Sequence, residues 1–185
     1  MNLEINTVLA NLFQAALDKS GQDAFRTHFD PDWRSDCEVG QQESDTLWRP
    51  LAQQPPVDFS GLANAVDAPI HPDISAYYGC FWAGTLESSS QEGHVSLIQL
   101  WNREDFDRLI GNLVGHFMAK KRSRQPFTVF FANTEPDSEL FLSIDNESGQ
   151  VLLEEPAKPP LRVVEKDLAS FLGRLSPVLT EAGIY

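Results

Sequence analysis

Side chains able to do acid–base, nucleophilic or metal chemistry stand apart from one another in this chain of 185 residues. The two cysteines, Cys37 and Cys80, have neither metal-binding nor redox spacing. No nucleophile turn of the GxSxG type, phosphate-binding glycine loop or dinucleotide fingerprint occurs. The histidines occur singly, outside any HExxH, HxH or Cys/His zinc pattern: His28, His71, His94 and His116. The sequence therefore predicts no metal, no cofactor and no enzyme activity.

One enzymatic alternative stays open, because a sequence does not show which residues meet in space. His94 or Cys80 could act as a base or nucleophile if a buried cleft gathered such residues and strongly shifted their pKa values. His116 falls beside the apolar stripe of a helix, so we expect it to be a packing residue. We interpret His71 with the following Pro and Asp as a turn.

The charge of the chain is strongly acidic and unevenly distributed. Lys and Arg number 14 against 27 Asp and Glu, a formal net charge of −13. Residues 1–102 hold 14 acids and 4 bases, a net charge of −10. Nucleic-acid phosphates and anionic lipids would be repelled, so we expect a basic partner.

The compartment predicted from the sequence is a reducing cytoplasm. The N-terminus lacks the charged and apolar regions of a signal peptide, and only two cysteines occur. No window approaches the 18 or so apolar residues that a membrane span needs. We therefore expect any membrane association to go through a protein partner.

A basic run, Lys120-Lys121-Arg122-Ser123-Arg124, interrupts the acidic pattern. It could contact RNA or lipid. Because the whole chain is so acidic, we favour a cluster of cations that complements the exposed carbonyls at a helix C-terminus.

The segment 95–133 predicts a strand, a helix and a second strand. Asn102 can cap the helix, and Pro126 prevents its continuation. Two strands joined by such a helix favour a right-handed crossover with the helix across one face of the sheet. We expect Gly111 and Gly115 to mark close backbone approach to a neighbouring element. The apolar positions repeat with the spacing of one buried helix face: Phe106, Leu109, Ile110, Leu113, Val114, Phe117 and Met118.

The remaining segments complete one α+β domain over residues 1–185, with a mixed β-sheet, a central crossover helix and packing helices at both ends of the chain. Between the terminal helices we predict mainly loops over 27–60, with one short strand at 46–48. The expected elements are helices at 5–19, 62–66 and 168–175, a strand opening over 76–82, a turn at 88–93, and a hairpin of 140–144 with 150–153.

One motif is specific enough to suggest a family: WNREDFDRLIGNLVGHFMAKKR, followed by the proline and an aromatic strand. On this motif the chain resembles Syd, the bacterial SecY-interacting protein family. Supporting segments are Cys37 through Glu43, Trp48-Arg49-Pro50, Ile70 to Ile74 leading to Tyr78, and Ala83-Gly84. The resemblance runs from about Cys37 to Ile144 and is weaker in both terminal helices. It implies a non-enzymatic protein loosely associated with the cytoplasmic face of the inner membrane, which binds SecY and regulates or monitors its assembly.

Charge offers a mechanism for such binding. Cytoplasmic loops of membrane proteins carry excess Lys and Arg, which suit an acidic concave surface. The side chains that we expect to make this surface are Glu38, Glu43, Asp45, Glu87 and Glu92. The family pattern carries further acids where this chain has Thr85 and His94.

Two further expectations concern the partner. We expect a monomer that binds SecY without inserting into lipid. The resemblance also extends to a wider superfamily that contains toxin-immunity proteins, so an alternative is an immunity-type protein that neutralises a basic toxin domain.

Overall fold

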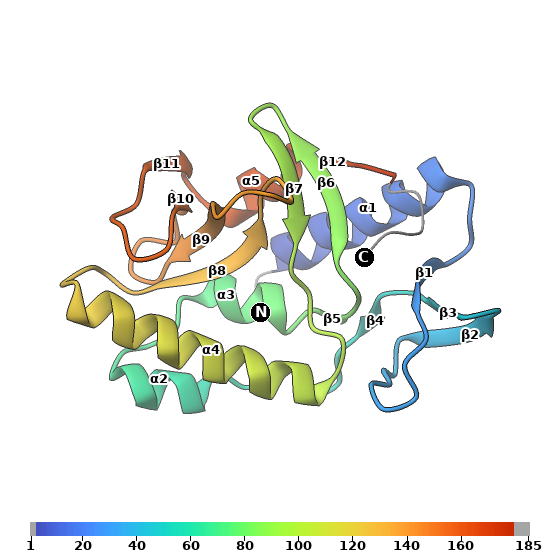
Figure 1. Ribbon diagram of the computed structural model, residues 1–185, viewed down its shortest axis with the longest axis horizontal. Coiled ribbons are helices and arrows are strands. Elements are labelled where there is room, and N and C mark those ends of the chain that lie inside the picture. Colours follow the sequence, from blue (N-terminus) through green and yellow to red (C-terminus); the bar gives the residue numbers. More distant parts are fainter. Residues whose placement is uncertain (1–2, 180–185) are drawn as a thin grey trace.

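A curled antiparallel sheet runs through the computed structural model, which describes residues 3–179 (Figure 1). Its strands are β6 (Leu86–Ser90), β7 (Gly93–Leu97), β8 (Thr128–Asn133), β9 (Phe141–Asp145), β10 (Val151–Glu154), β11 (Arg162–Glu165) and β12 (Ser176–Pro177). They lie in the order β11, β10, β9, β8, β7, β6 and β12. Each recorded pairing of neighbours is antiparallel.

Two smaller sheets involve the first half of the chain. The strands β1 (Phe25–His28), β2 (Glu38–Gln42) and β3 (Asp45–Trp48) form a sheet in the order β1, β3 and β2. The short strands β4 (Leu51–Ala52) and β5 (Phe81–Trp82) pair with each other. Trp48 joins the three-stranded sheet to the core, since its ring stacks on Phe25 at 4.5 Å and meets the edge of Phe13 at 6.2 Å.

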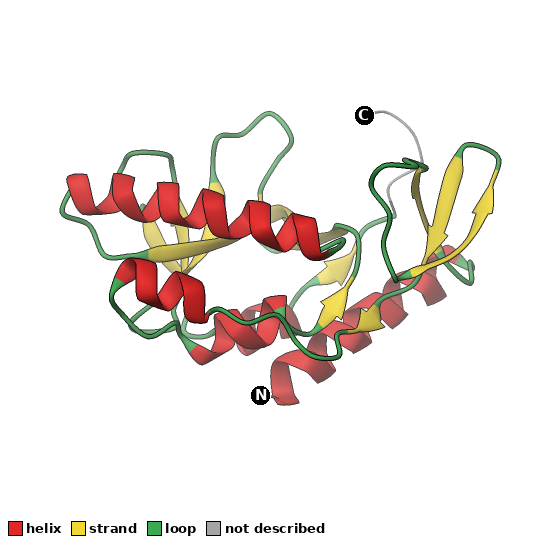
Figure 2. Ribbon diagram, turned by 90° about the horizontal axis from the view of Figure 1, so that it is seen from below, coloured by secondary structure: helices red, strands yellow, loops and turns green. Residues whose placement is uncertain are grey.

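Five helices pack around these sheets: α1 (Leu3–Ser20), α2 (Ser60–Val66), α3 (Pro72–Tyr78), α4 (Arg103–Arg122) and α5 (Leu168–Gly173). α1 contacts α3, α5 and β12, whereas α2 contacts α4. Figure 2 shows α4 and α2 side by side, with α1 far from them across the molecule. The chain is thus a single compact α+β domain, as predicted.

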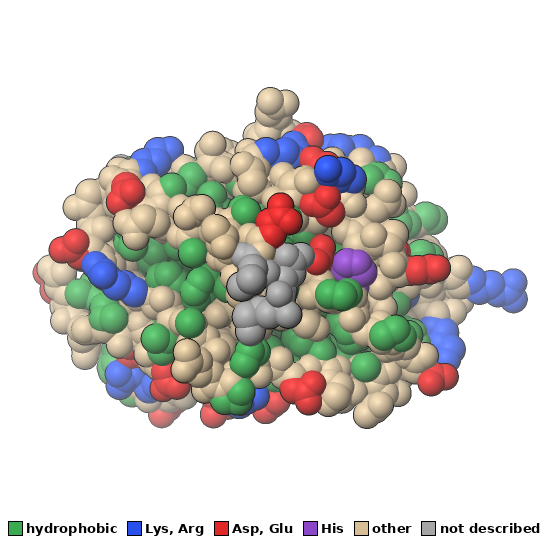
Figure 3. Space-filling model, turned by 180° about the vertical axis from the view of Figure 1, so that it is seen from behind, with side chains coloured by type: hydrophobic (Ala, Val, Ile, Leu, Met, Phe, Trp, Pro, Cys, Tyr) green, Lys and Arg blue, Asp and Glu red, His purple; other side chains and the backbone are tan. Residues whose placement is uncertain are grey.

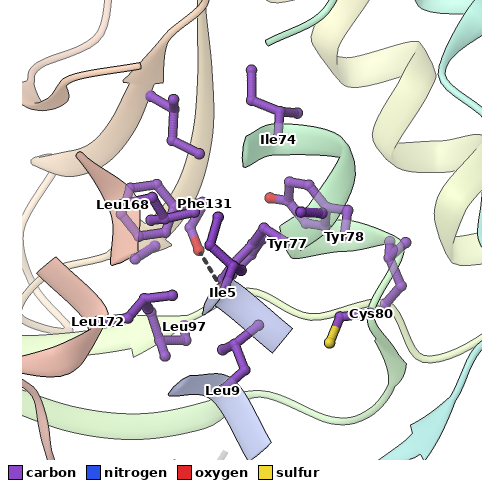
Figure 4. Packing of buried hydrophobic residues seen from close by; sticks show 14 of the residues in the cluster. Ile5, Leu9, Ile74, Tyr77, Tyr78, Cys80, Leu97, Phe131, Leu168 and Leu172 are labelled. Carbon is purple, nitrogen blue, oxygen red and sulfur yellow. Dashed lines mark hydrogen bonds between the residues drawn. The ribbon is translucent and has the colours of Figure 1, made fainter. Parts of the chain in front are cut away.

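The core lies where α1 and α5 meet strands β7 and β8. Figure 4 shows Ile5 and Leu9 of α1 close to Leu97 of β7 and Leu172 of α5. All four are buried. Because Ile5 and Leu9 are four residues apart, one face of the predicted N-terminal helix delivers both to the core.

The helix α4 begins and ends as predicted, but the strands it joins are antiparallel. The Asn102 side chain caps α4 by accepting a hydrogen bond from Asp105 N at 2.8 Å. Ser96 of β7 pairs with Asn133 of β8, and Leu97 pairs with Ala132, in antiparallel register. The predicted crossover and the mixed sheet are therefore wrong. The helix lies against the sheet, and the chain re-enters the sheet at the same end from which it left, as antiparallel neighbours require.

Several local predictions over 27–100 are also wrong. The segment predicted as loops contains the end of β1 together with β2 and β4. In the predicted turn at 88–93, only residues 91–92 lie outside the strands β6 and β7. The strand predicted to open over 76–82 is limited to β5, because residues 72–78 form the helix α3. His71 caps the N-terminus of α3, and its Nδ1 accepts a hydrogen bond from Asp73 N. Pro72 at the first helical position and buried Ile74, Tyr77 and Tyr78 at helical spacing explain this outcome.

The basic run does not behave as one cluster. Lys120 is buried, and its ammonium group forms an ion pair with the carboxylate of Glu154, a residue that is 0% exposed. Although burial opposes ionisation, hydrogen bonds from Lys120, Ser143 and Thr128 lower the pKa of Glu154. His116 is a packing residue as predicted: its Nε2 lies 2.9 Å from Thr128 Oγ1, and burial lowers its pKa.

Gly111 and Gly115 do not mark a close approach. Both residues are exposed on α4, and a Cβ built at either position would meet no atom within 4 Å. The predicted packing against a neighbouring element is therefore wrong.

Replacing Gly111 or Gly115 with Ala should stabilise the protein. Glycine in a helix interior costs about 0.5–1 kcal/mol relative to alanine, and here no steric term opposes the gain. Urea unfolding of each single variant should show a higher midpoint with an unchanged slope. A lower midpoint would mean that the glycines serve a packing role in the folded state.

Candidate functional site

Two hollows lie near the β6–β7 hairpin. The first, which we call the hairpin hollow, has a volume of about 160 Å³. The second, the junction hollow, has a volume of about 310 Å³. The hairpin hollow is lined by Glu92, His94, Glu135, Leu142, Arg162 and Phe171, among others. The junction hollow lies between the three-stranded sheet and β6, with lining residues that include Phe25, Arg26, Trp48, Thr85 and Glu87.

A contact between Glu87 and His94 links the two hollows, because Glu87 lines one and His94 the other. His94 Nε2 lies 2.7 Å from Glu87 Oε2. The other carboxylate oxygen of Glu87 accepts a hydrogen bond from Ser96 Oγ at 2.9 Å. The register of the hairpin positions this group, since Glu87 pairs with Ser96 and Ser89 pairs with His94 on adjacent strands.

A second acid of the hairpin, Glu92, is held by Arg174. Arg174 Nη1 donates to Glu92 Oε2 at 2.7 Å, and Arg174 Nε lies 3.5 Å from Glu165 Oε2. The hydrogen bond from Arg174 lowers the pKa of Glu92. The guanidinium also lies over the ring of Phe171, 5.1 Å from its centre. Glu92 is therefore an ordered carboxylate at the rim of an apolar hollow.

The connection between β8 and β9 adds a third carboxylate. Glu135 Oε1 accepts a hydrogen bond from His94 N at 3.0 Å. Glu135 thus brings a negative charge beside the main chain of His94.

Glu38 lies in the other sheet and is already paired. Its carboxylate forms an ion pair with Arg34 at 2.6 Å and accepts a hydrogen bond from Ser35 N at 2.8 Å. The hydrogen bond from Arg34 lowers the pKa of Glu38, and the carboxyl side chain is only 8% exposed. Much of its charge is therefore balanced inside the protein.

Glu43 and Asp45 lie at the β2–β3 turn. Glu43 is exposed and has a φ of 56°, and Asp45 is half-buried. Neither carboxylate forms an ion pair with any residue from 3 to 179. Both are available to a cationic partner.

The five predicted acids thus fall into two groups on different sheets. Glu87 and Glu92 belong to the β6–β7 hairpin, whereas Glu38, Glu43 and Asp45 belong to the three-stranded sheet. Figure 3 shows one face of the molecule, on which acidic side chains are spread among basic and apolar ones.

Sequence analysis did not predict Glu135, Arg162 or Arg174 as site residues. Arg174 lies 82 residues from Glu92, and Glu135 lies 41 residues from His94. No motif marks them. The only available signal was that 134–139 is a short acidic segment between two strands.

The buried thiols do not support nucleophilic chemistry. Burial raises the pKa of Cys37 to about 11 and that of Cys80 to about 12, so both stay protonated at neutral pH. Neither cysteine lines the hollow that contains His94. Among residues 3–179, no cluster of three or more His, Cys, Asp or Glu side chains could hold a metal ion.

Comparison with known proteins identifies the family. The family model described as "Syd protein (SUKH-2)" matches residues 4–177. The chain belongs to the Syd family. It is 34% identical to Protein Syd of Pseudoalteromonas atlantica over 171 residues, which cover 90% of this chain and 91% of that one. It is 31% identical to Protein Syd of Alteromonas mediterranea, covering 96% and 99% of the two chains. For Protein Syd of Hahella chejuensis, the identity is 41%, with 77% and 73% covered.

Two segments that carried the resemblance to Syd meet in the fold. A Cβ added to Gly84 would lie 2.7 Å from Cζ2 of Trp48. The Trp-Arg-Pro and Ala-Gly motifs of this Syd chain are therefore two sides of one packing contact, next to the junction hollow. None of the helices within the described residues has the length and apolarity needed to cross a membrane.

Proposed function

We propose that this Syd-family protein is a non-enzymatic, monomeric adaptor. It binds the basic cytoplasmic loops of SecY and regulates or monitors assembly of the translocon on the cytoplasmic face of the inner membrane. Family membership is the observation that carries the proposal, since the match covers residues 4–177. The acidic composition supports it, because the positive-inside rule gives such loops the opposite charge.

The contacts of the individual acids refine the proposed surface. Glu43 and Asp45 have no internal partner among residues 3–179, so their charge is free to attract a Lys or Arg of the loop. At the hairpin, Glu92 is paired with the guanidinium of Arg174, Glu87 contacts the imidazole of His94, and Glu135 accepts a hydrogen bond from the main-chain N–H of His94. A SecY cation would have to compete with these groups, so Glu43 and Asp45 should contribute more to long-range attraction.

The experiment measures binding of the full chain to purified SecY and to peptides of its basic cytoplasmic loops. The double variant Glu43→Lys, Asp45→Lys should weaken binding about tenfold or more, because two attractive charges become repulsive. Raising the salt from about 0.15 M to about 1 M should also weaken binding, since the Debye length falls from about 8 Å to about 3 Å.

The matched control is Asp107→Lys, Asp137→Lys, which makes the same change in net charge at two exposed positions elsewhere in the chain. This control should bind more tightly than Glu43→Lys, Asp45→Lys. No binding of the unmodified chain to folded SecY at low salt would refute the proposed function. Equal effects of the two double variants would refute the assignment to the β2–β3 turn.

A further inference from the structure

Three cations at the C-terminal end of α4 have no anionic partner among residues 3–179. Within residues 3–179, six of the 14 Lys and Arg side chains form ion pairs, but Lys121, Arg122 and Arg124 do not. With Lys120 buried, these three exposed side chains form what we call the basic tip. Three unpaired cations within four residues are unexpected in a protein with a net charge of −13.

Capping of α4 does not account for the basic tip. Main-chain N–H groups already satisfy carbonyls of the last turn: Ser123 N donates to Ala119 O, Arg124 N to Lys121 O and Gln125 N to Lys120 O. Arg124 lies beyond the last helical residue, with a φ of 55°. Only Arg122 makes a side-chain contact with a helix carbonyl, from Nε to Met118 O at 3.4 Å.

Apolar surface adjoins these cations. Met118 is 47% exposed. The Lys121 ammonium lies over the ring of Phe117 at 5.6 Å, and that ring meets the edge of Phe127 at 5.4 Å. Phe127 in turn lines an open groove of about 500 Å³. The groove is mainly apolar, with Pro69, Ile70, Pro72 and Pro126 among its lining residues and Glu147 as its one acid.

The basic tip and the acidic β2–β3 turn lie at opposite ends of the molecule. Figure 1 shows the C-terminal end of α4 at one extreme of the long axis and the β2–β3 turn at the other. α4 has 20 residues and is therefore about 30 Å long. This length exceeds three Debye lengths of about 8 Å at physiological ionic strength, so the distant acids do not cancel the field of the tip.

We infer that the basic tip, with Met118 and the adjoining apolar groove, is a contact site for an anionic membrane surface. Cations beside exposed apolar side chains suit the boundary between lipid headgroups and acyl chains. A bilayer can touch one end of a molecule, whereas a nucleic-acid strand would have to run on across acidic surface. This contact would act in addition to docking on a protein partner. It differs from the expectation, based on net charge alone, that anionic lipids would be repelled.

The test uses the full chain and vesicles that contain no protein, so it is independent of binding to SecY. Cosedimentation is measured with vesicles of phosphatidylcholine alone and with phosphatidylglycerol added. The unmodified chain should bind only the anionic vesicles. Each cation contributes roughly fivefold, so Lys121→Gln, Arg122→Gln, Arg124→Gln should lower the partition coefficient about 100-fold. Met118→Ser should lower it to a smaller extent.

The matched control is Arg26→Gln, Arg103→Gln, Arg162→Gln, which removes three other exposed cations without ion pairs among the described residues. It should retain binding, and circular dichroism should confirm that both triple variants are folded. The inference is overturned if the unmodified chain does not bind anionic vesicles, or if both triple variants lose binding equally. Binding of a short single-stranded oligonucleotide through the tip, without binding to vesicles, would also overturn it.

Discussion

Replacing Lys120 with Met should lower the free energy of unfolding by about 3–5 kcal/mol, because it removes one partner of a buried ion pair. Glu154 is fully buried, and its carboxylate also accepts a hydrogen bond from Ser143 Oγ. Without the ammonium group it must stay charged without a counter-ion or take up a proton. Either change costs free energy that the unfolded chain does not pay. The loss is a large fraction of the roughly 5–15 kcal/mol of a typical domain.

Urea unfolding near neutral pH measures this effect, and Lys121→Met is the matched control. Lys121 is the next residue on α4 and is exposed, so its replacement should change the free energy of unfolding by less than about 0.5 kcal/mol. The double variant Lys120→Met, Glu154→Leu should be more stable than Lys120→Met alone, because no buried charge remains. If Lys120→Met cost no more than Lys121→Met, the ion pair would not be buried as described.

Replacing Gly84 with Ala should destabilise the protein by about 1–3 kcal/mol through overpacking. The added Cβ would lie 2.7 Å from Cζ2 and 2.9 Å from Cε2 of Trp48. Trp48 is 3% exposed and is in contact with Phe13, Phe25 and Trp101, so its ring has little room to move. The junction between the three-stranded sheet and the main sheet should therefore loosen first.

A double-mutant cycle with Trp48→Phe separates this contact from other effects of the substitution. A phenyl ring lacks the outer fused ring of indole, which includes Cζ2, so the closest contact is absent in the double variant. Gly84→Ala should then cost less in the Trp48→Phe background than in the natural one. If the losses in the free energy of unfolding from Gly84→Ala and Trp48→Phe were additive, the effect of Gly84→Ala would not arise from contact with Trp48. Gly111→Ala is a control in which the same substitution meets open space.

Lys120 shows what sequence analysis could and could not reach. Its place on the buried face was predictable, since Phe106, Leu113 and Lys120 recur at seven-residue intervals, which is two helical turns. Its position in a run of cations favoured an exposed cluster instead. Its partner, Glu154, lies 34 residues away on β10, and no local pattern connects the two.

The candidate site was predictable only in its acids. Glu87 and Glu92 were predicted, and the structure places both beside hollows. Their contacts to His94 and Arg174 were not predicted, nor was the approach of Glu135. Such contacts depend on strand register and on the packing of the end of α5 beside the β6–β7 hairpin, which a single sequence does not reveal.

The sequence by itself determined the features that depend on neighbours along the chain. It was sufficient for the amphipathic helices, the Asn102 cap, the 140–153 hairpin, the α+β class and the resemblance to Syd, because periodicity and capping act over a few residues. Only the tertiary structure decided that β7 and β8 are antiparallel, that Lys120 is buried, and that Glu38, Glu87 and Glu92 have internal partners. These outcomes depend on which distant segments pack together, since burial and ion pairing act through space.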